Sequence, residues 1–589
     1  MLATRGENRL ALWMTMKSFV LGSKIAAWRA GKGCLAVALP VILMLNSARA
    51  ADESIQIRLN TVGYLPSAQK QASIAAPCTN FTVIRLSDGQ KVLSGQAAGP
   101  VLNADTQEQL YTADFSPCTE PGEYELEVDG VGLSAPFHIA DNLYREPFST
   151  VMLGMYLWRC GTAVNATYEG QTFAHELCHT NDAWLDSVGG GHAQKDGTKG
   201  WHDAGDYNKY TVNAGVAVGV MFRAWEDFGP QIRKVRLAIP EAGGKLPDFL
   251  AELKWEMDWV LTMQAPDGSV YHKLTTKRFG GFIPPEAETT ERYFTPWGSE
   301  ATADFVGMTA QAARIFKPYD RAFAKRCLQA AEKSYRFLKA HPEYHKADQT
   351  GFHTGNYEVN QPDRRLDGVP NNRLWAQAEL WETTGKRDVL RDLENNIRSM
   401  HGQVNNDFDW EEVKDLGLIT YVFSQRHGRD PALVKLVRDN VLAVADGIVQ
   451  TRGRDGYARP LGSVYYWGDN GGVARQTVLL MTADRLTRSG KTGVSKPEYR
   501  AVCLDALNHL FGRNYYGRSF VTGLGFNPPL HPHDRRNGIG HGPWPGYLVG
   551  GPHPKAADWH DEQGDFRTNE IAINWNGALI YALAACLNN

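Results

Sequence analysis

The feature that most constrains the fold is a change of hydrophobic periodicity near residue 140. Before it, apolar and polar residues alternate, as in residues 55–59, 81–86 and 124–128. Alternation with glycine- and proline-containing turns between the runs is typical of short antiparallel strands. Residues 51–140 therefore predict a small β-sandwich of immunoglobulin-like size, to which the sequence assigns no chemistry.

After this point apolar residues recur with a helical period. Leu433, Val437 and Val444, for example, fall on one helix face. About twelve such segments with almost no strand between them predict a mainly α domain over 141–589, built by packing helix on helix. Twelve helices would also make six helical hairpins closed in a ring, but the sequence indicates the number and not the closure. The predicted helices lie near residues 145–160, 212–228, 246–264, 301–317, 320–341, 371–385, 387–401, 410–428, 430–450, 470–489, 496–512 and 570–587.

Residues 1–50 have the pattern of a secretory signal peptide. Basic residues precede an apolar run from Cys34 to Leu45, and Ala48-Arg49-Ala50 supplies a small-x-small cleavage site. We expect cleavage after Ala50 and export to a periplasm or the medium. The run is too short to span a bilayer, and no later segment resembles a membrane span, so no membrane association is expected.

Charge and cysteine content narrow the function class. A formal charge of −3 over 589 residues argues against a nucleic-acid partner, because phosphate binding needs a basic face.

The cysteines bear on possible disulfides. Without Cys34, which lies in the predicted signal peptide, seven of the eight cysteines remain, so they cannot all pair. In an oxidising compartment a disulfide between Cys78 and Cys118 is one option.

The stretch from Trp201 to Tyr210, WHDAGDYNKY, carries two carboxylates three positions apart, Asp203 and Asp206. Asp and Gly disfavour a helix interior, so the stretch predicts a turn ahead of the next helix. On a turn both carboxylates could hold one water molecule, as a general base requires. The alternative is an Asx-turn that only caps the helix.

Glu570 stands at the start of the last apolar segment. Ile571 and Trp575 follow it, and partial desolvation by such neighbours would raise its pKa and keep it protonated, as a general acid needs to be. The alternative is a carboxylate that merely favours the helix dipole. One such acid and a separate base are what cleavage of a glycosidic bond requires.

A second group is formed by Cys160, Cys178, His179 and His192. Thiolates and imidazoles within a short span suit tetrahedral zinc. A disulfide between Cys160 and Cys178, with solvated histidines, is the alternative in an exported chain.

Three motifs in order resemble glycoside hydrolase family 9, the cellulase family of inverting β-1,4-glucanases with an (α/α)6 barrel. They are WHDAGDYNKY at 201–210, NPPLHPHDR at 527–535 and the run from Trp559 to Asn576. The subgroup that the chain most resembles has an immunoglobulin-like domain ahead of the barrel. The resemblance covers nearly the whole of the chain after residue 50.

The resemblance implies roles for individual residues. Asp206 would be the general base, Asp203 would help to hold the water, and Glu570 would be the acid. His533 and Arg535 match the family's substrate-contacting pair, and Asp561 matches the acidic residue of its C-terminal signature, so we expect His533 and Asp561 in the catalytic set.

For metals, the resemblance implies a structural zinc site. Cys160, Cys178 and His179 would be ligands with His192 as the fourth, and His202 is the alternative. Calcium is not favoured, because residues 360–372 carry fewer carboxylates than the acidic run that relatives have there. No organic cofactor is implied.

The aromatic residues that would stack on sugar rings are harder to assign. Trp467 lies in a segment that resembles one beside the family's cleft, and Tyr516 lies in a long loop. We expect both to bind substrate, although core packing is the alternative for any single ring.

Together with its motifs, the resemblance implies a monomeric endo-β-1,4-glucanase that hydrolyses cellulose-like glucans with inversion. An exo-acting cellodextrinase, β-glucosidase or exo-glucosaminidase on the same scaffold is the alternative among enzymes. A non-catalytic carbohydrate-binding protein is the alternative from a different class.

Overall fold

Two separate apolar cores form, one among the strands that end at Ile139 and one among the helices that begin at Arg145. The structure is a computed structural model, and it describes residues 55–358, 371–488, 496–537 and 542–588. Among these residues no helix has both the length and the apolar character needed to cross a membrane.

The first core is enclosed by two sheets, as the alternating pattern predicted. In the strand Gly122–Val128, Tyr124, Leu126 and Val128 are buried while the residues between them are more exposed. One sheet has the antiparallel order β1-β3-β7-β6; the other has the order β2-β10-β8-β4-β5, with β2 and β10 parallel and β9 paired to β8. The strands are β1 (Ile57–Arg58), β2 (Gly63–Tyr64), β3 (Gln71–Ile74), β4 (Asn80–Arg85), β5 (Gln90–Gln96), β6 (Ala98–Leu102), β7 (Gln109–Asp114), β8 (Gly122–Val128), β9 (Gly132–Leu133) and β10 (Phe137–Ile139).

Cys78 and Cys118 both belong to this core but do not form the disulfide considered above. Cys118 is buried, Cys78 packs at the edge of the core, and both are free thiols. Burial raises the pKa of the Cys118 thiol, which favours its behaviour as a small apolar group.

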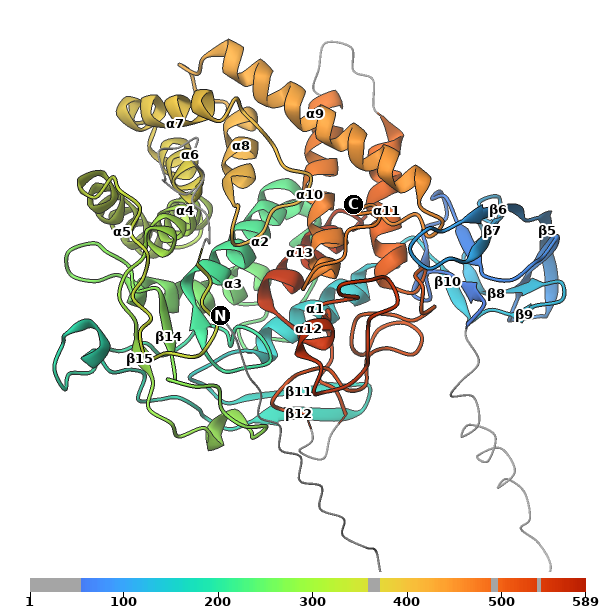
Figure 1. Cartoon of the computed structure of the whole chain (residues 1–589), viewed down its shortest axis with the longest axis horizontal. Coiled ribbons are helices and arrows are strands. Elements are labelled where there is room, and N and C mark those ends of the chain that lie inside the picture. Colours follow the sequence, from blue (N-terminus) through green and yellow to red (C-terminus); the bar gives the residue numbers. More distant parts are fainter. Residues whose placement is uncertain (1–54, 359–370, 489–495, 538–541, 589) are drawn as a thin grey trace, which may run out of the picture. The chain divides into compact units, whose positions relative to one another are not determined.

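Among the described residues, the second core is enclosed by twelve long helices, in agreement with the predicted number, and a one-turn helix. Figure 1 labels them along the chain. These helices are α1 (Arg145–Leu157), α2 (Thr211–Ile232), α3 (Asp248–Val260), α4 (Ser299–Phe316), α5 (Arg321–Ala340), α6 (Asn372–Thr384), α7 (Arg387–Ser399), α8 (Lys414–Phe423), α9 (Pro431–Arg454), α10 (Asp469–Arg488), α11 (Pro497–Leu510), α12 (Phe566–Asn569) and α13 (Ile573–Ala584).

The long helices alternate between an inner and an outer position along the chain. α2 packs against α4 and α13, α4 against α6, α6 against α8, and α10 against α13. These six inner helices are buried along almost their whole length. The outer helices α5, α7 and α9 bury only one face. Such alternation is the arrangement of an (α/α)6 barrel, and it confirms the predicted fold class.

Two stretches between the predicted helices contain strands. Residues 164–175 form a hairpin of β11 (Val164–Tyr168) and β12 (Gln171–His175), and Glu169-Gly170 turns with positive φ at both positions. That turn geometry matches the twist of two-residue hairpins. A second small sheet joins β13 (Lys209–Tyr210), β14 (Lys273–Thr275) and β15 (Tyr293–Phe294). The sheets give both stretches a fixed framework beside the inner helices.

Candidate active site

The turn that carries Asp203 and Asp206 is held in place by backbone hydrogen bonds. The His202 amide donates to the Trp158 carbonyl at 2.8 Å, and the Asp203 amide donates to the Asn208 carbonyl at 3.0 Å. β13 and α2 follow directly. The turn predicted from the composition is therefore present, and it is buried at both aspartates.

Three segments that are far apart in the sequence meet at this turn. The Arg535 amide donates to the Gly205 carbonyl at 3.0 Å, and the Ile573 amide donates to the Asp203 carbonyl at 2.9 Å. A Cβ atom at Gly205 would lie 2.1 Å from the His533 carbonyl oxygen. Only glycine permits so close a backbone approach.

A cavity of about 310 Å³ lies beside this junction. Asp203, Asp206 and Glu570 all line this cavity. The other lining residues are Ala204, Tyr210, Phe279, Gly355, Asn356, Tyr357, Asp409, Trp410, Trp467, Ala572, Asn574 and Trp575.

Both carboxylate oxygens of Asp203 have protein donors. Asn213 Nδ2 donates to Oδ1 at 2.8 Å, and the Tyr357 hydroxyl donates to Oδ2 at 2.7 Å. Burial raises the pKa of Asp203 well above its ordinary value, the Asp206 carboxylate adds to the rise, and the two donors oppose it. The side chain is therefore fixed in orientation.

Asp206 differs because its donors all lie on one oxygen. Asn208 Nδ2 at 2.6 Å and the Tyr210 hydroxyl at 3.2 Å both donate to Oδ2. Within the described ranges Oδ1 has no protein donor. This oxygen is available to accept a proton from a water molecule in the cavity, which is the task of a general base.

Glu570 lies three residues before the first residue of α13 rather than inside a helix, because Glu570 and Ala572 are in extended conformations. Its backbone pairs with His533 in a β-bridge. Burial raises the pKa of Glu570 well above its ordinary value, the nearby Asp206 adds to the rise, and Arg535 opposes it. A carboxyl group that keeps its proton at neutral pH can act as a general acid.

His533 and Arg535 flank Glu570 with unpaired nitrogen atoms. His533 Nδ1 lies 2.7 Å from the Gln563 carbonyl oxygen, to which it must donate. Arg535 Nε donates to the Gly280 carbonyl at 3.1 Å, while its buried Nη1 has no partner in the described chain. Both side chains can therefore still bond to a ligand.

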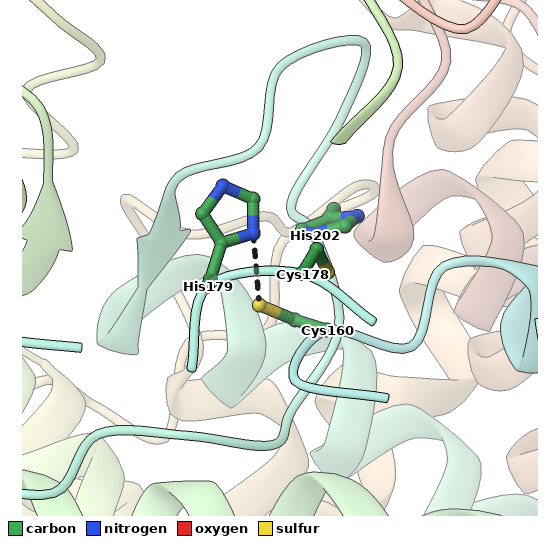
Figure 2. A group of neighbouring side chains, drawn as sticks. All are labelled: Cys160, Cys178, His179 and His202. Carbon is green, nitrogen blue, oxygen red and sulfur yellow. Dashed lines mark hydrogen bonds between the residues drawn. The ribbon is translucent and has the colours of Figure 1, made fainter. Parts of the chain in front are cut away.

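Cys160, Cys178, His179 and His202 form a compact group next to this turn (Figure 2). One ligand atom from each lies within 4.8 Å of the others. The Cys160 Sγ–His179 Nδ1 distance is 3.6 Å and the Cys178 Sγ–His202 Nε2 distance is 4.0 Å. Tetrahedral zinc with ordinary Zn–S and Zn–N bonds places sulfur and nitrogen about 3.6 Å apart. The donor set and its spacing therefore fit zinc.

The surroundings of this group also fit a metal site. Glu288 Oε2 lies 3.3 Å from His179 Nε2, the nitrogen that faces away from the cysteines. Such a carboxylate orients a metal-binding imidazole. Burial lowers the pKa of His202 to about 3, so its ring is neutral and can donate a lone pair. Because His202 precedes Asp203, an ion bound here would hold the catalytic turn.

Comparisons with known proteins agree with this geometry. The family model described as Glycosyl hydrolase family 9 matches residues 144–583, and the one described as Cellulase N-terminal ig-like domain matches residues 52–133. The chain belongs to glycosyl hydrolase family 9. It is thus a glycoside hydrolase of an inverting family, as its motifs indicated.

Three family 9 relatives cover most of the chain. Endoglucanase D of Acetivibrio thermocellus is 53% identical over 538 residues, which span 90% of this chain and 83% of the relative. The crystal structure of a metagenome-derived glycoside hydrolase family 9 endoglucanase is 32% identical, with a TM-score of 0.83 over 90% of this chain and 99% of the other. A Zn-binding triple mutant of the family 9 endoglucanase J30 is 29% identical, with a TM-score of 0.81 over 89% and 99% of the two chains.

Three of the predicted site residues need correction. His192 lies outside the metal-binding group, because its exposed ring stacks on Trp184 and faces Asp186; His202 takes its place. Tyr516 does not line the cavity, since its hydroxyl accepts a hydrogen bond from the Trp559 amide at 2.7 Å. Trp467 does line it and is 47% exposed.

Asp561 is the third correction, because it supports the site without lining the cavity. Its carboxylate accepts from the amides of Leu530 and His531, at 2.9 and 2.8 Å, and from Arg518 Nη2 at 2.9 Å. It therefore positions the loop that leads to His533 and does not contact the reacting atoms.

Sequence reasoning missed several residues of this family 9 site. Tyr357 and the pair Asp409-Trp410 were not singled out, and Trp410 was assigned to a helix that begins only at Lys414. The cluster of acidic and aromatic residues at 407–412 was the available signal. Of the calcium candidates, residues 360–370 lie outside the described residues.

Proposed function

We propose that this family 9 enzyme is an endo-β-1,4-glucanase that hydrolyses cellulose-like glucans by single displacement with inversion. One observation carries the proposal: Glu570, a carboxyl group with a raised pKa, and Asp206, whose Oδ1 has no donor among the described residues, line the same cavity. The similarity to Endoglucanase D supports the substrate class and the endo mode of action.

The geometry divides the chemistry among three carboxyl groups. Glu570 donates its proton to the glycosidic oxygen as the bond to the leaving sugar breaks. Asp206 Oδ1 accepts a proton from the water that attacks the anomeric carbon. Asp203 is held by two donors, and its remaining lone pairs can orient the same water. The product then has the opposite anomeric configuration.

A product time course tests the mode of action. We expect the viscosity of carboxymethyl cellulose to fall well before reducing ends accumulate, and proton NMR of early products to show the α-anomer first.

Substitution of the acid and the base tests the assigned roles. We expect Glu570→Gln and Asp206→Asn to lose about 10²- to 10⁴-fold in kcat, the range for general acid–base catalysis. Glu562→Gln, at an exposed neighbouring position, is the control. Early β-anomer, or wild-type turnover in Glu570→Gln, would refute the mechanism.

For the metal site, we propose that Cys160, Cys178, His179 and His202 bind one zinc ion with a structural role. All four ligand positions are supplied by protein, and a closed tetrahedral site leaves no position for substrate. The ion would tie the loop after β12 to the turn that carries Asp203. The Zn-binding triple mutant among the relatives supports a zinc ion on this scaffold.

Metal analysis tests this site independently of activity. We expect about one zinc per chain in purified protein, and a lower melting temperature after treatment with a strong chelator. A Cys160–Cys178 disulfide found by mass spectrometry would exclude the site.

We also propose that the protein is exported as a monomer. The basic residues, apolar run and small-x-small site of residues 1–50 support export. Fractionation with N-terminal sequencing should find a mature chain that begins at Ala51, and gel filtration should give the mass of one chain. Full-length protein in the cytoplasm would contradict the export.

A further inference from the structure

Lys273 is a buried cation beside the catalytic cavity to which the mechanism above assigns no role. It is 0% exposed, and it lies in β14 directly opposite Tyr210 of β13. Its Nζ donates to the Gly355 carbonyl at 2.7 Å and to the Thr354 hydroxyl at 3.1 Å. In the part of the chain that the structure describes, no carboxylate forms an ion pair with this ammonium. Burial of a charge without an ionic partner is costly, which points to a function for it.

Gly355, which accepts from Lys273, is bonded through its amide as well. That amide donates to the Tyr210 hydroxyl oxygen at 3.2 Å. The same hydroxyl donates to Asp206 Oδ2 at 3.2 Å. A series of hydrogen bonds therefore leads from the ammonium through Gly355 and Tyr210 to the carboxylate of the general base.

Tyr357, two residues further on, connects the same segment to the other aspartate. Its hydroxyl donates to Asp203 Oδ2 at 2.7 Å. Its φ of 45° is one that an aromatic residue rarely adopts, and such a backbone persists only where its surroundings fix it. Gly355 is tightly packed here, since a Cβ on it would lie 3.1 Å from ring atoms of both Tyr210 and Tyr357. The position of the Tyr357 hydroxyl thus depends on how Gly355 is held.

Three neighbouring side chains on and beside β14 contact segment 354–357. His272 Nε2 lies 2.6 Å from the Asn356 carbonyl oxygen, and Thr275 Oγ1 lies 2.8 Å from Thr354 Oγ1. Burial lowers the pKa of His272 to about 4, so its ring is neutral. Burial lowers the pKa of Lys273 only to about 8, so this side chain keeps its charge at neutral pH. A charged donor makes the strongest hydrogen bond of the three.

We propose that Lys273 is a positioning residue for the two catalytic aspartates. Its ammonium holds segment 354–357 in the conformation from which the hydroxyls of Tyr210 and Tyr357 bond to those carboxylates. Lys273 does not line the cavity, so it acts through the two tyrosines and not on the substrate. This role rests on the proposed glucanase function.

Steady-state kinetics on cellopentaose test the proposal with Lys273→Met, which keeps the length of the side chain and removes its charge and its donors. We expect kcat to fall about tenfold or more, because a small displacement of catalytic groups is costly in rate. We expect KM to stay within about twofold of wild type, because no substrate contact is removed. Lys273→Arg retains a charged donor and should recover most of the lost kcat. A kcat within about twofold of wild type in Lys273→Met, or a loss confined to KM, would overturn the proposal.

A double-mutant cycle tests the route through Tyr357. In a Tyr357→Phe background we expect Lys273→Met to lower kcat by at most about threefold, because the hydrogen bond that Lys273 positions is already absent. Equal losses of kcat in the two backgrounds would overturn the route.

The matched control is Lys70→Met in the β-sandwich. Lys70 is also 0% exposed, and its Nζ donates to the backbone carbonyls of Pro66, Ala68 and Ser116 at 2.6, 2.9 and 3.2 Å. We expect this variant to keep the wild-type kcat. If Lys273→Met loses no more kcat than Lys70→Met, the loss reflects removal of any buried ammonium, and the positioning role is overturned.

Circular dichroism melts identify a variant that fails to fold. If Lys273→Met does so, Thr354→Val takes its place, because it removes only the hydroxyl that accepts from Lys273. A fall in kcat with unchanged KM is again expected, and a wild-type kcat would overturn the proposal. A wild-type enzyme that is inactive on cellopentaose would instead refute the glucanase function.

Discussion

Substitution of Tyr357 by Phe isolates the role of one hydrogen bond in the catalytic centre. The Tyr357 hydroxyl donates to Asp203 Oδ2 at 2.7 Å. Burial raises the pKa of Asp203, and this hydrogen bond opposes the rise because it stabilises the charged carboxylate. A hydrogen bond to a charged group contributes about 1.5–3 kcal/mol. Its loss should lower kcat/KM about 10- to 150-fold at acidic pH, because each 1.4 kcal/mol corresponds to a factor of ten.

The pH dependence separates this effect from general damage. We expect the charged form of Asp203 to hold the attacking water. Loss of the Tyr357 hydrogen bond raises the pKa of Asp203 further, so the activity of Tyr357→Phe should begin to fall at a higher pH than that of the wild type when the medium is acidified. The assay is kcat/KM on cellopentaose across the pH range, with Tyr168→Phe as control, since the Tyr168 hydroxyl donates to the Gly523 carbonyl at 2.6 Å away from the cavity. If the acidic limb of the kcat/KM–pH profile stays in place and kcat/KM falls by the same factor at every pH, the reasoning is refuted.

Three further results are expected. In Gly205→Ala the new Cβ would lie 2.1 Å from the His533 carbonyl oxygen, so the two segments must move apart. We expect kcat/KM to fall about 100-fold or more, the effect of a displacement of about 1 Å. Wild-type kinetics would contradict the packing of the three segments. His202→Ala should lose zinc by metal analysis while His192→Ala keeps it, and the reverse would restore His192 as ligand. Because the pKa of Glu570 is raised, kcat should fall as pH rises through it; a basic limb that persists in Glu570→Gln would assign that limb to another group.

Local chemistry made much of the site predictable. The WHDAGD stretch could only form a turn, because Asp and Gly disfavour a helix interior. An apolar neighbourhood for Glu570 could be anticipated from Ile571 and Trp575, and the raised pKa agrees with it. The fourth member of the metal-binding group was wrongly predicted as His192, because His192 and His202 are both near Cys178 in sequence and only folding buries one of them.

Residues that act through long-range contacts were beyond the reach of the sequence. Asp561 belongs to a motif, yet only the structure shows that its oxygens hold the amides of Leu530 and His531. Tyr357 is 154 positions from Asp203, and no local pattern connects the two. The hydroxyl of Tyr516 likewise finds its partner in a distant segment.

The sequence by itself indicated the β-then-α division and about twelve helices, and it singled out three carboxyl groups as candidates, since periodicity, turn chemistry and motifs are local properties of a chain. Tertiary structure alone decided which inner helices pack against one another and that Asp206 and Glu570 line one cavity, because contacts between distant segments depend on how whole helices pack. It also decided which oxygen of Asp206 stays free, since donors from its own turn occupy only the other one.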